Sequence, residues 1–307
     1  MDKKEKIFVA GHNGLVGSAL IRNLTGNGYS NLVTRSRAEL DLSNQAQVIE
    51  FFKHERPAYV FLAAAKVGGI YANNTFPTDF AYQNLMIQGN VLMNAYKSGV
   101  KKLLFLGSSC IYPKDCPQPI KEEYLLSGYL EPTNEAYALA KIAGLKMCQY
   151  FNRQYGTKFI SVMPTNLYGP HDNFDLQESH VLPALLRKIH EAKFSKTPFV
   201  EVWGTGKPLR EFLHVDDLAD ACVFLMNTYD GNDYLNIGTG LDVTIAELAN
   251  IIMKVVGYNG ELQFNPDKPD GTYRKLLDVS KLDKLGWRYK IGLEEGIRQT
   301  YDWYLKH

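Results

Sequence analysis

The sequence predicts an α/β protein with a doubly wound parallel sheet and a smaller α/β domain that is discontinuous in the chain. Its first half alternates short apolar runs with amphipathic stretches, as a parallel sheet covered by helices requires. Three glycines, Gly11, Gly14 and Gly17, directly follow the first apolar run. Beyond Pro164 the alternation fades into loops rich in Pro, Gly, Asn and His. A length of 307 residues leaves room for two domains of ordinary size.

The elements of the first half follow in the order strand, helix, strand, helix, strand. Residues 58–64 form a continuous apolar run, which suits a strand buried on both faces of a parallel sheet. We expect strands at residues 7–10, 32–34, 58–64, 102–106 and 159–163. We expect helices at residues 15–24, 45–54, 79–97 and 134–155. Right-handed crossovers would wind these elements into one sheet.

The second half is expected to divide between two domains. Residues 1–164 would form the first domain, and residues 165–307 would supply most of the second. A helix at 215–226 and a strand at 234–237 are expected to return to the first sheet. The returning segment would therefore lie near residues 211–238.

Composition and charge exclude several classes of protein. Apolar residues make up 45% of the chain and charged residues 22%, which is typical of a globular domain and not of a disordered or coiled-coil chain. The 34 basic residues are balanced by 33 acidic residues, so the net charge of +1 lacks the basic excess typical of nucleic-acid binding. No apolar run approaches the roughly 20 residues of a membrane span, and residues 1–6 are too polar for a signal peptide. We therefore expect no nucleic-acid partner and no membrane association.

The four cysteines bear on the cellular compartment and on metal binding. Cys110, Cys116, Cys148 and Cys222 form no CxxC pair, and so few cysteines in so long a chain do not make a disulfide framework. A cytoplasmic location is expected, and no metal site is indicated. Any of these cysteines that matters chemically is expected to act as a thiol.

The glycine segment points to a bound dinucleotide. The first glycine permits a tight turn, the second lets the backbone approach a pyrophosphate, and the third lets the helix pack on the strand. The N-terminus of the following helix attracts phosphate charge. This arrangement is typical of a Rossmann domain, although the spacing is GxxGxxG and not GxGxxG. Glycines of an ordinary strand-to-helix turn are the alternative for the motif by itself.

The residues after the second expected strand favour NADP as the cofactor. An acidic side chain at this place would bind the ribose of NAD, whereas arginine can bind the 2′-phosphate of NADP. Here the strand runs into Arg35 and Arg37, and either guanidinium could fork onto a phosphate. Solvated surface arginines are the alternative. Asp41 and Leu42 follow and could lie beside the adenine, although an aspartate in a turn often serves as a cap.

A second motif indicates carbonyl reduction or alcohol oxidation. Tyr137 and Lys141 are four residues apart on an expected helix, so both side chains share one face. A lysine cation beside the phenol would lower the pKa of the tyrosine toward the working range. Ser108 lies at the carboxyl end of the fourth expected strand and could bind the same substrate oxygen. If the chain stays extended, the side chain of Cys110 points the same way as that of Ser108.

Together these motifs resemble the extended short-chain dehydrogenase/reductase family. The similarity is closest to its branch of epimerase-reductases that act on nucleotide sugars, and it covers nearly the whole chain. The segments that carry it are residues 11–17, 62–70, 107–113, 130–135, 137–141, 162–174, 203–217 and 268–278.

The resemblance implies a homodimeric enzyme that uses NADP(H). Its activity would be epimerisation at carbons 3 and 5 and reduction at carbon 4 of GDP-4-keto-6-deoxy-D-mannose, which yields GDP-L-fucose. The reductase residues would be Ser108, Tyr137 and Lys141, and the epimerase base and acid would be Cys110 and His180. The substrate positions would be Ser109, Lys188, Trp203, Arg210 and Asp270. The cofactor positions would be Gly11, His12, Asn13, Gly14, Leu15, Val16, Gly17, Arg35, Arg37, Asp41, Leu42, Leu106, Gly107, Lys141, Pro164, Thr165, Asn166, Leu167 and His180.

One departure and three rival functions stand beside this interpretation. The first loop has Asn13 where some relatives have arginine, so one contact to a 2′-phosphate is missing. A 4,6-dehydratase would carry an acidic pair near the serine, and Ser109-Cys110 offers none. A simple 4-epimerase would have no use for Cys110 and His180. A non-catalytic NADP-binding protein would lack the tyrosine or the lysine of the motif, and both are present.

Overall fold

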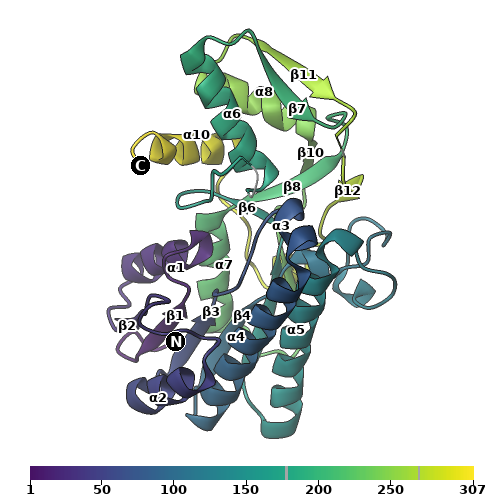
Figure 1. The fold of residues 1–307 in the computed structure, drawn as a ribbon. Helices are drawn as coiled ribbons and strands as arrows, with labels where there is room; N and C mark the ends of the chain where they lie inside the picture. Colours follow the sequence, from purple (N-terminus) through teal and green to yellow (C-terminus); the bar gives the residue numbers. More distant parts are fainter. Residues whose placement is uncertain (177–178, 269) are drawn as a thin grey trace.

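A computed structural model describes residues 1–176, 179–268 and 270–307. Within these ranges, the lower half of Figure 1 contains a six-stranded parallel sheet in the order β2-β1-β3-β4-β5-β9. From β1 the chain adds β2 on one side and then crosses over to add β3 on the other, as in a doubly wound Rossmann sheet. The predicted fold class is therefore confirmed. The strands are β1 (Ile7–Ala10), β2 (Leu32–Val33), β3 (Tyr59–Leu62), β4 (Lys102–Leu106), β5 (Phe159–Pro164) and β9 (Leu235–Ile237).

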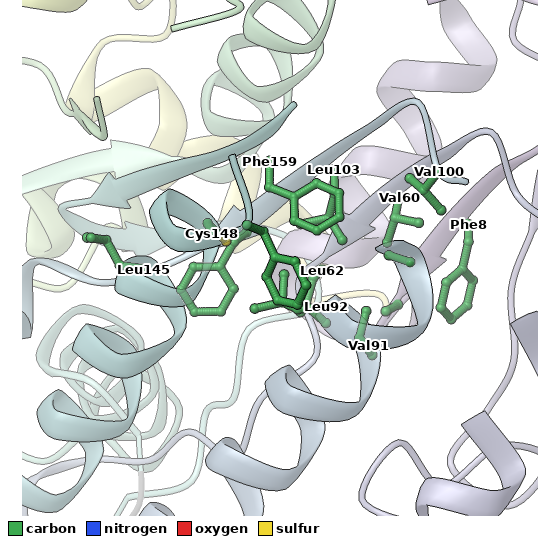
Figure 2. Close-up of a cluster of buried hydrophobic side chains, with 14 of the residues drawn as sticks. Phe8, Val60, Leu62, Val91, Leu92, Val100, Leu103, Leu145, Cys148 and Phe159 are labelled. Carbon is green, nitrogen blue, oxygen red and sulfur yellow. The ribbon is translucent and has the colours of Figure 1, made fainter. Parts of the chain in front are cut away.

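Helices cover both faces of this sheet, because alternate strand residues point to opposite sides. Phe8 and Leu103 face one cluster of buried side chains, part of which Figure 2 shows. The helices on that side are α2 (Gln45–Glu55), α4 (Pro77–Lys97) and α5 (Glu135–Tyr155). Val9 and Leu104 face a second cluster on the opposite side. Its helices are α1 (Leu15–Gly26), α7 (Val215–Thr228) and α9 (Ser280–Lys284).

The upper half of Figure 1 is built around β8. In the chain, β6, α6 and β7 lie between Pro164, the last residue of β5, and β8. Strand β8 pairs with β6, β10 and β12, and β7 pairs separately with β11. These strands are β6 (Asn166–Tyr168), β7 (Phe199–Trp203), β8 (Leu209–His214), β10 (Asp242–Thr244), β11 (Glu261–Asn265) and β12 (Arg274–Lys275). Three helices pack around a third apolar cluster, namely α6 (Val181–Ser195), α8 (Ile245–Val256) and α10 (Leu293–Tyr304).

Most expected elements of the first half agree with the structure to within one or two residues at each end. The expected strand at 234–237 joins the first sheet as β9, beside β5. A short helix, α3 (Ile70–Thr75), was not expected. The segment after β4 also differs from expectation, because Ser109–Ile111 forms a 3₁₀ turn. Two further 3₁₀ turns lie at Glu122–Tyr124 and Pro132–Asn134.

Candidate functional site

The turn between β1 and α1 accepts only glycine at two of its three glycine positions. Gly11 has a φ of +86°, and a Cβ there would lie 2.8 Å from the backbone nitrogen of Ala64. A Cβ on Gly17 would lie 2.0 Å from the carbonyl oxygen of Gly11. Helix α1 begins after Gly14, and in the described chain no side chain caps its first turn. Its free backbone N–H groups therefore form a site that suits a phosphate.

Of the described polar residues after β2, Arg35 and Asp41 are paired within the protein, whereas Arg37 is free to bind a ligand. Arg35 donates from Nη2 to Oε1 of Glu55 at 2.6 Å, so its charge is already paired. Asp41 accepts hydrogen bonds from the hydroxyl and amide of Ser43, and these bonds lower the pKa of Asp41. This is the turn-cap alternative for the aspartate. Arg37 is exposed, and within the described ranges its guanidinium has no recorded hydrogen bond, so it is the arginine free for a phosphate.

The expected cofactor residues at the ends of β4 and β5 lie on adjacent strands. Leu106 ends β4, and a Cβ on the following Gly107 would lie 2.4 Å from the sulfur of Met163. Pro164 ends β5, and Leu167 lies in β6. Thr165 and Asn166 both donate to the carbonyl oxygen of Glu211 on β8, at 3.2 and 2.8 Å. Leu42, farther from these residues, packs against the apolar cluster of α2 and α4.

The serine, tyrosine and lysine of the second motif meet at the carboxyl end of β4. Ser108 accepts from the amide of Cys110 at 3.2 Å and hydrogen-bonds the hydroxyl of Tyr137. Lys141 is buried on α5, donates to the carbonyl oxygen of Leu106 at 2.8 Å, and places its Nζ 5.8 Å from the ring centroid of Tyr137. The three side chains are therefore brought together as the motif predicts.

The expected lowering of the tyrosine pKa is wrong for this arrangement. Burial raises the pKa of Tyr137, the charge of a neighbouring Cys110 raises it further, and the hydrogen bond with Ser108 opposes them. Burial also lowers the pKa of Lys141 to about 7. Both side chains are removed from water, which disfavours the phenolate and the ammonium alike.

Cys110 lies beside the same serine. The chain between them is a 3₁₀ turn and not the extended strand expected from the sequence. Ser108 caps the 3₁₀ turn that starts at the buried Ser109, and the serine hydroxyl also interacts with the thiol. Lys275 on β12 places its Nζ 3.5 Å from the sulfur. Burial opposes ionisation of Cys110, but Lys275 and Ser108 outweigh it, so the pKa of this thiol is lowered.

His180 is the N-cap residue of α6. It precedes Val181, the first residue of the helix, and its imidazole is accessible to solvent although protein atoms surround it. Burial, and then the charge of Lys275, lower the pKa of His180. The lysine therefore acts electrostatically on both the cysteine and the histidine.

A basic and aromatic surface lies above this centre, around β7 and β8. The indole of Trp203 is 52% exposed, and Nζ of Lys188 lies 4.9 Å from its ring centroid. Lys268 approaches the same ring at 5.3 Å. Burial lowers the pKa of Arg210, and the charge of Asp270 opposes this shift. An exposed aromatic ring among cations suits a purine base linked to a diphosphate.

Asp270 has a structural contact in addition to its place beside Arg210. Its carboxylate accepts from the backbone amide of Thr205 at 2.6 Å and from the hydroxyl of Thr205 at 2.7 Å. These bonds hold the turn that follows Trp203.

Two residues of the site, Lys268 and Lys275, were missed by sequence reasoning. Lysines at exposed positions are common, and both lie far along the chain from the residues they approach. The only signal was that both fall inside segment 268–278, which helps to carry the family resemblance.

Comparisons with known proteins agree with this geometry. The model of a family described as "NAD dependent epimerase/dehydratase family" matches residues 7–238. GDP-L-fucose synthase 1 of Arabidopsis thaliana is 63% identical over 306 residues, which is 100% of this chain and 95% of that protein. GDP-L-fucose synthase of Escherichia coli K12 is 56% identical over 99% of this chain and 98% of its own length. A solved GDP-mannoheptose C4 reductase from Campylobacter jejuni, with NADP bound, has a TM-score of 0.93 and 46% identity, and the match covers 99% of each chain.

Proposed function

Since the chain belongs to the NAD dependent epimerase/dehydratase family, we propose that it converts GDP-4-keto-6-deoxy-D-mannose to GDP-L-fucose with NADPH. The observation that carries this proposal is the thiol of Cys110. It lies beside the Ser108 and Tyr137 pair and in contact with a cation. A reductase needs the serine, the tyrosine and Lys141 alone, whereas the placed thiol gives this site a base for carbon acids.

The reduction step uses the carbonyl oxygen at carbon 4 of the sugar. Ser108 and Tyr137 donate hydrogen bonds to this oxygen, and Tyr137 transfers its proton to it as the alcohol forms. NADPH supplies the hydride when it is bound. Lys141, held by the carbonyl of Leu106, lies beside the phenol, and its protonated form would stabilise the phenolate as it develops.

The epimerisation steps use the same polarised carbonyl. Carbons 3 and 5 both flank carbon 4, so a proton leaving either carbon gives an enolate whose oxygen Ser108 and Tyr137 stabilise. The Cys110 thiolate removes the proton: the C–H bond breaks, an S–H bond forms, and the electron pair enters the enolate. His180 then delivers a proton to the opposite face of the carbon, which inverts its configuration.

Nucleotide binding divides between the two halves of Figure 1. NADP(H) fits the turn at Gly11 and Gly17, whose close backbone packing only glycine allows and which leads into the uncapped start of α1, and the buried Nδ1 of His12 has no partner among the described residues. Arg37 would bind its 2′-phosphate. On the substrate side, Trp203 would stack on guanine, and Lys188, Lys268 and Arg210 would neutralise the diphosphate. Residues 1–164 would thus hold the cofactor and residues 165–307 mainly the sugar nucleotide.

The proposal includes a homodimer in the cytoplasm. Helices α4 and α5 pack side by side, and both expose apolar side chains on their outer surface, namely Tyr82, Leu85, Met93, Leu139 and Tyr150. Such a surface suits a second copy of the chain. All four cysteines lie in the described ranges as free thiols, which suits a reducing compartment. No helix of the described residues is long and apolar enough to cross a bilayer.

The second candidate function is reduction of a GDP-linked 4-keto sugar without epimerisation, which the solved GDP-mannoheptose C4 reductase favours. The test is incubation of the purified chain with GDP-4-keto-6-deoxy-D-mannose and NADPH, with the product identified by NMR. We expect GDP-L-fucose. A D-configured 6-deoxy sugar would favour the reductase, and the absence of NADPH oxidation would contradict both functions.

The matched variant for this test is Cys110→Ser. In D₂O without NADPH, the wild-type chain should exchange deuterium into carbons 3 and 5 of the keto sugar, and Cys110→Ser should not, because a hydroxyl is far less acidic than a thiol. Cys148→Ser is the control, since Cys148 is buried in the apolar cluster that contains α5. Exchange by Cys110→Ser at the wild-type rate would assign the base to another residue.

A further inference from the structure

Strand β12 brings Lys275 to the sulfur of Cys110 from a part of the chain 165 residues away. The Nζ to Sγ distance is 3.5 Å, which is a hydrogen-bonding contact for sulfur. In Figure 1, β12 lies at the junction of the lower sheet and the upper half of the molecule. The contact therefore joins the reductase centre to the segment that follows the substrate surface.

Several bonds on both sides of Lys275 fix the course of this segment. Lys275 pairs with Arg210 in the register of β12 with β8. The preceding Arg274 donates from Nε to Asp242 at 2.5 Å. The amides of Leu276 and Leu277 donate to Gln118 at 2.9 Å and to buried Glu211 at 3.0 Å. The backbone that carries Lys275 is therefore fixed by strand pairing and hydrogen bonds, which hold the lysine side chain near the thiol.

The groups that act on the thiol come from three elements. Ser108, at the end of β4, and Tyr137, on α5, are uncharged hydrogen-bonding groups. His180, at the start of α6, feels the charge of Lys275 as well. Lys275 is therefore the cation that acts on the sulfur, and an ammonium next to a thiol favours the thiolate.

We propose that Lys275 is the positioning residue of the epimerase base: its ammonium donates a hydrogen bond to the Cys110 sulfur, holds it as a thiolate and aims it at the substrate carbons next to the carbonyl. The inference rests on the proposed function and deepens it. Lys275 keeps its proton throughout. When the thiolate takes a proton from carbon 3 or 5, the S–H bond forms on sulfur, and the lysine loses a partner but no bond.

The other cysteines provide an internal reference for this effect. Burial raises the pKa of Cys116, of Cys148 to about 12, and of Cys222. Figure 2 shows Cys148 inside the apolar cluster under α5. Slow alkylation by iodoacetamide, followed peptide by peptide with mass spectrometry, should therefore report on Cys110 alone in the folded full-length chain.

The experiment measures the pH dependence of Cys110 alkylation in four chains: wild type, Lys275→Met, Lys275→Arg and Lys254→Met. Lys275→Met should move the midpoint upward by at least about one pH unit and slow alkylation at pH 7 about tenfold. Lys275→Arg should restore most of the rate. Lys254 pairs with Glu294 on the surface, so Lys254→Met removes the same charge without touching the thiol and should match the wild type.

A structural role of Lys275 is separated by raising the pH. The thiol ionises unaided in alkaline solution, so alkylation and deuterium exchange by Lys275→Met should recover toward wild-type rates near pH 9.5. A misfolded chain would not regain deuterium exchange, and its buried Cys148 and Cys222 would become open to alkylation. An unchanged midpoint in Lys275→Met, or a variant that stays slow at pH 9.5, would overturn the inference.

The thiol titration also distinguishes this inference from the proposed function, because it needs no sugar. The pH midpoint of Cys110 alkylation could depend on Lys275 while the wild type exchanges no deuterium into the keto sugar. That result would support the lysine-thiolate pair and contradict the epimerase function. Exchange by the wild type with no dependence on Lys275 would keep the epimerase and reject the pair.

Discussion

Tyr137 shows how a single phenol depends on its surroundings. Its hydroxyl interacts with Ser108, while the Nζ of Lys141 lies 5.8 Å from its ring centroid and donates to the backbone carbonyl of Leu106. Tyr137→Phe removes the proton that must reach the oxygen at carbon 4. We expect turnover to fall by about 10²–10⁴-fold, with cofactor affinity unchanged, because general acid catalysis has this magnitude. NADPH oxidation and fluorescence titration of NADPH measure the two quantities.

Tyr129→Phe is the matched control for this substitution. Tyr129 is 95% exposed, so loss of its hydroxyl should change neither turnover nor affinity. Reduction by Tyr137→Phe at a rate close to that of the wild type would transfer the acid role to another group, and Ser108 would be the first candidate.

The burial of Lys141 makes the free energy of unfolding depend on pH, and the direction of this dependence follows from its lowered pKa. Its ordinary pKa of 10.5 is lowered to about 7 in the folded chain, so between pH 7 and 10.5 the unfolded chain binds more protons than the folded chain. The free energy of unfolding should therefore rise with pH across this window, by up to about 1.4 kcal/mol per pH unit from this group.

Lys141→Met isolates the contribution of this lysine, because methionine keeps much of the aliphatic chain and cannot titrate. Urea unfolding at several pH values between 7 and 10 should give a shallower slope for the variant than for the wild type. Parallel slopes would mean that Lys141 stays protonated in the folded chain.

The residues of the site differ in how far sequence could predict them. Ser108, Tyr137 and Lys141 follow from helix spacing and from the end of an apolar strand, which are local patterns. The contact of Lys275 with Cys110 depends on strand pairing between distant segments, which no local pattern specifies. The pKa of Tyr137 was predicted in the wrong direction because the sequence shows the neighbouring charge but not the depth of burial.

At the scale of single elements, the turn into α1 has the strictest requirement. Gly17→Ala places a methyl group 2.0 Å from the carbonyl oxygen of Gly11, so the backbone of the turn must shift. We expect a loss of roughly 1–3 kcal/mol, or about 2–4 °C in melting temperature per kcal/mol, and weaker binding of NADPH. Differential scanning fluorimetry and NADPH titration measure these effects.

Gly26→Ala serves as the control within the same helix. A Cβ on Gly26 meets no atom within 4 Å, and alanine is the better helix former, so stability should stay equal or rise by up to about 1 kcal/mol. If Gly17→Ala behaved like Gly26→Ala, the close approach of helix and turn would not be needed.

The elements themselves were predicted unevenly, for a physical reason. Strands buried on both faces, such as β3, are continuous apolar runs and were found within two residues of their ends. Strand β12 has two residues, and β10 has three of mixed polarity, so their strand character comes from pairing with β8. The 3₁₀ turn at Ser109–Ile111 depends on Ser108 capping the amide of Cys110, which a strand pattern cannot indicate.

At the scale of the molecule, one buried carboxylate joins the two halves. Glu211 on β8 is fully buried, and burial raises its pKa. It accepts from the amides of Thr239 and Gly240, which follow β9 of the first sheet, and from Leu277, which follows β12. The cofactor half, the substrate surface and the strand that carries Lys275 therefore share one anchor.

The outer surface of α4 and α5 carries the prediction for the whole molecule. Leu85 is 45% exposed and Leu139 is 52% exposed on neighbouring helices that pack against each other. A dimer that buries this surface would lose apolar contacts on both copies if either leucine became charged, because a symmetric interface uses the same patch twice. Light scattering after size exclusion should give twice the 34.7 kDa chain mass for the wild type. The double variant Leu85→Asp, Leu139→Asp should give the mass of one chain.

Leu305→Asp is the control for charge on an exposed leucine, since Leu305 is equally exposed but lies at the end of α10, away from these helices. It should remain dimeric. The active site opens at the carboxyl ends of β4 and β5, whereas the α4–α5 surface covers a face of the sheet, so a monomeric double variant should retain the Lys275-dependent alkylation of Cys110. A double variant that still runs as a dimer would assign the interface to another surface, and a wild-type chain that runs as a monomer would remove the homodimer from the proposed function.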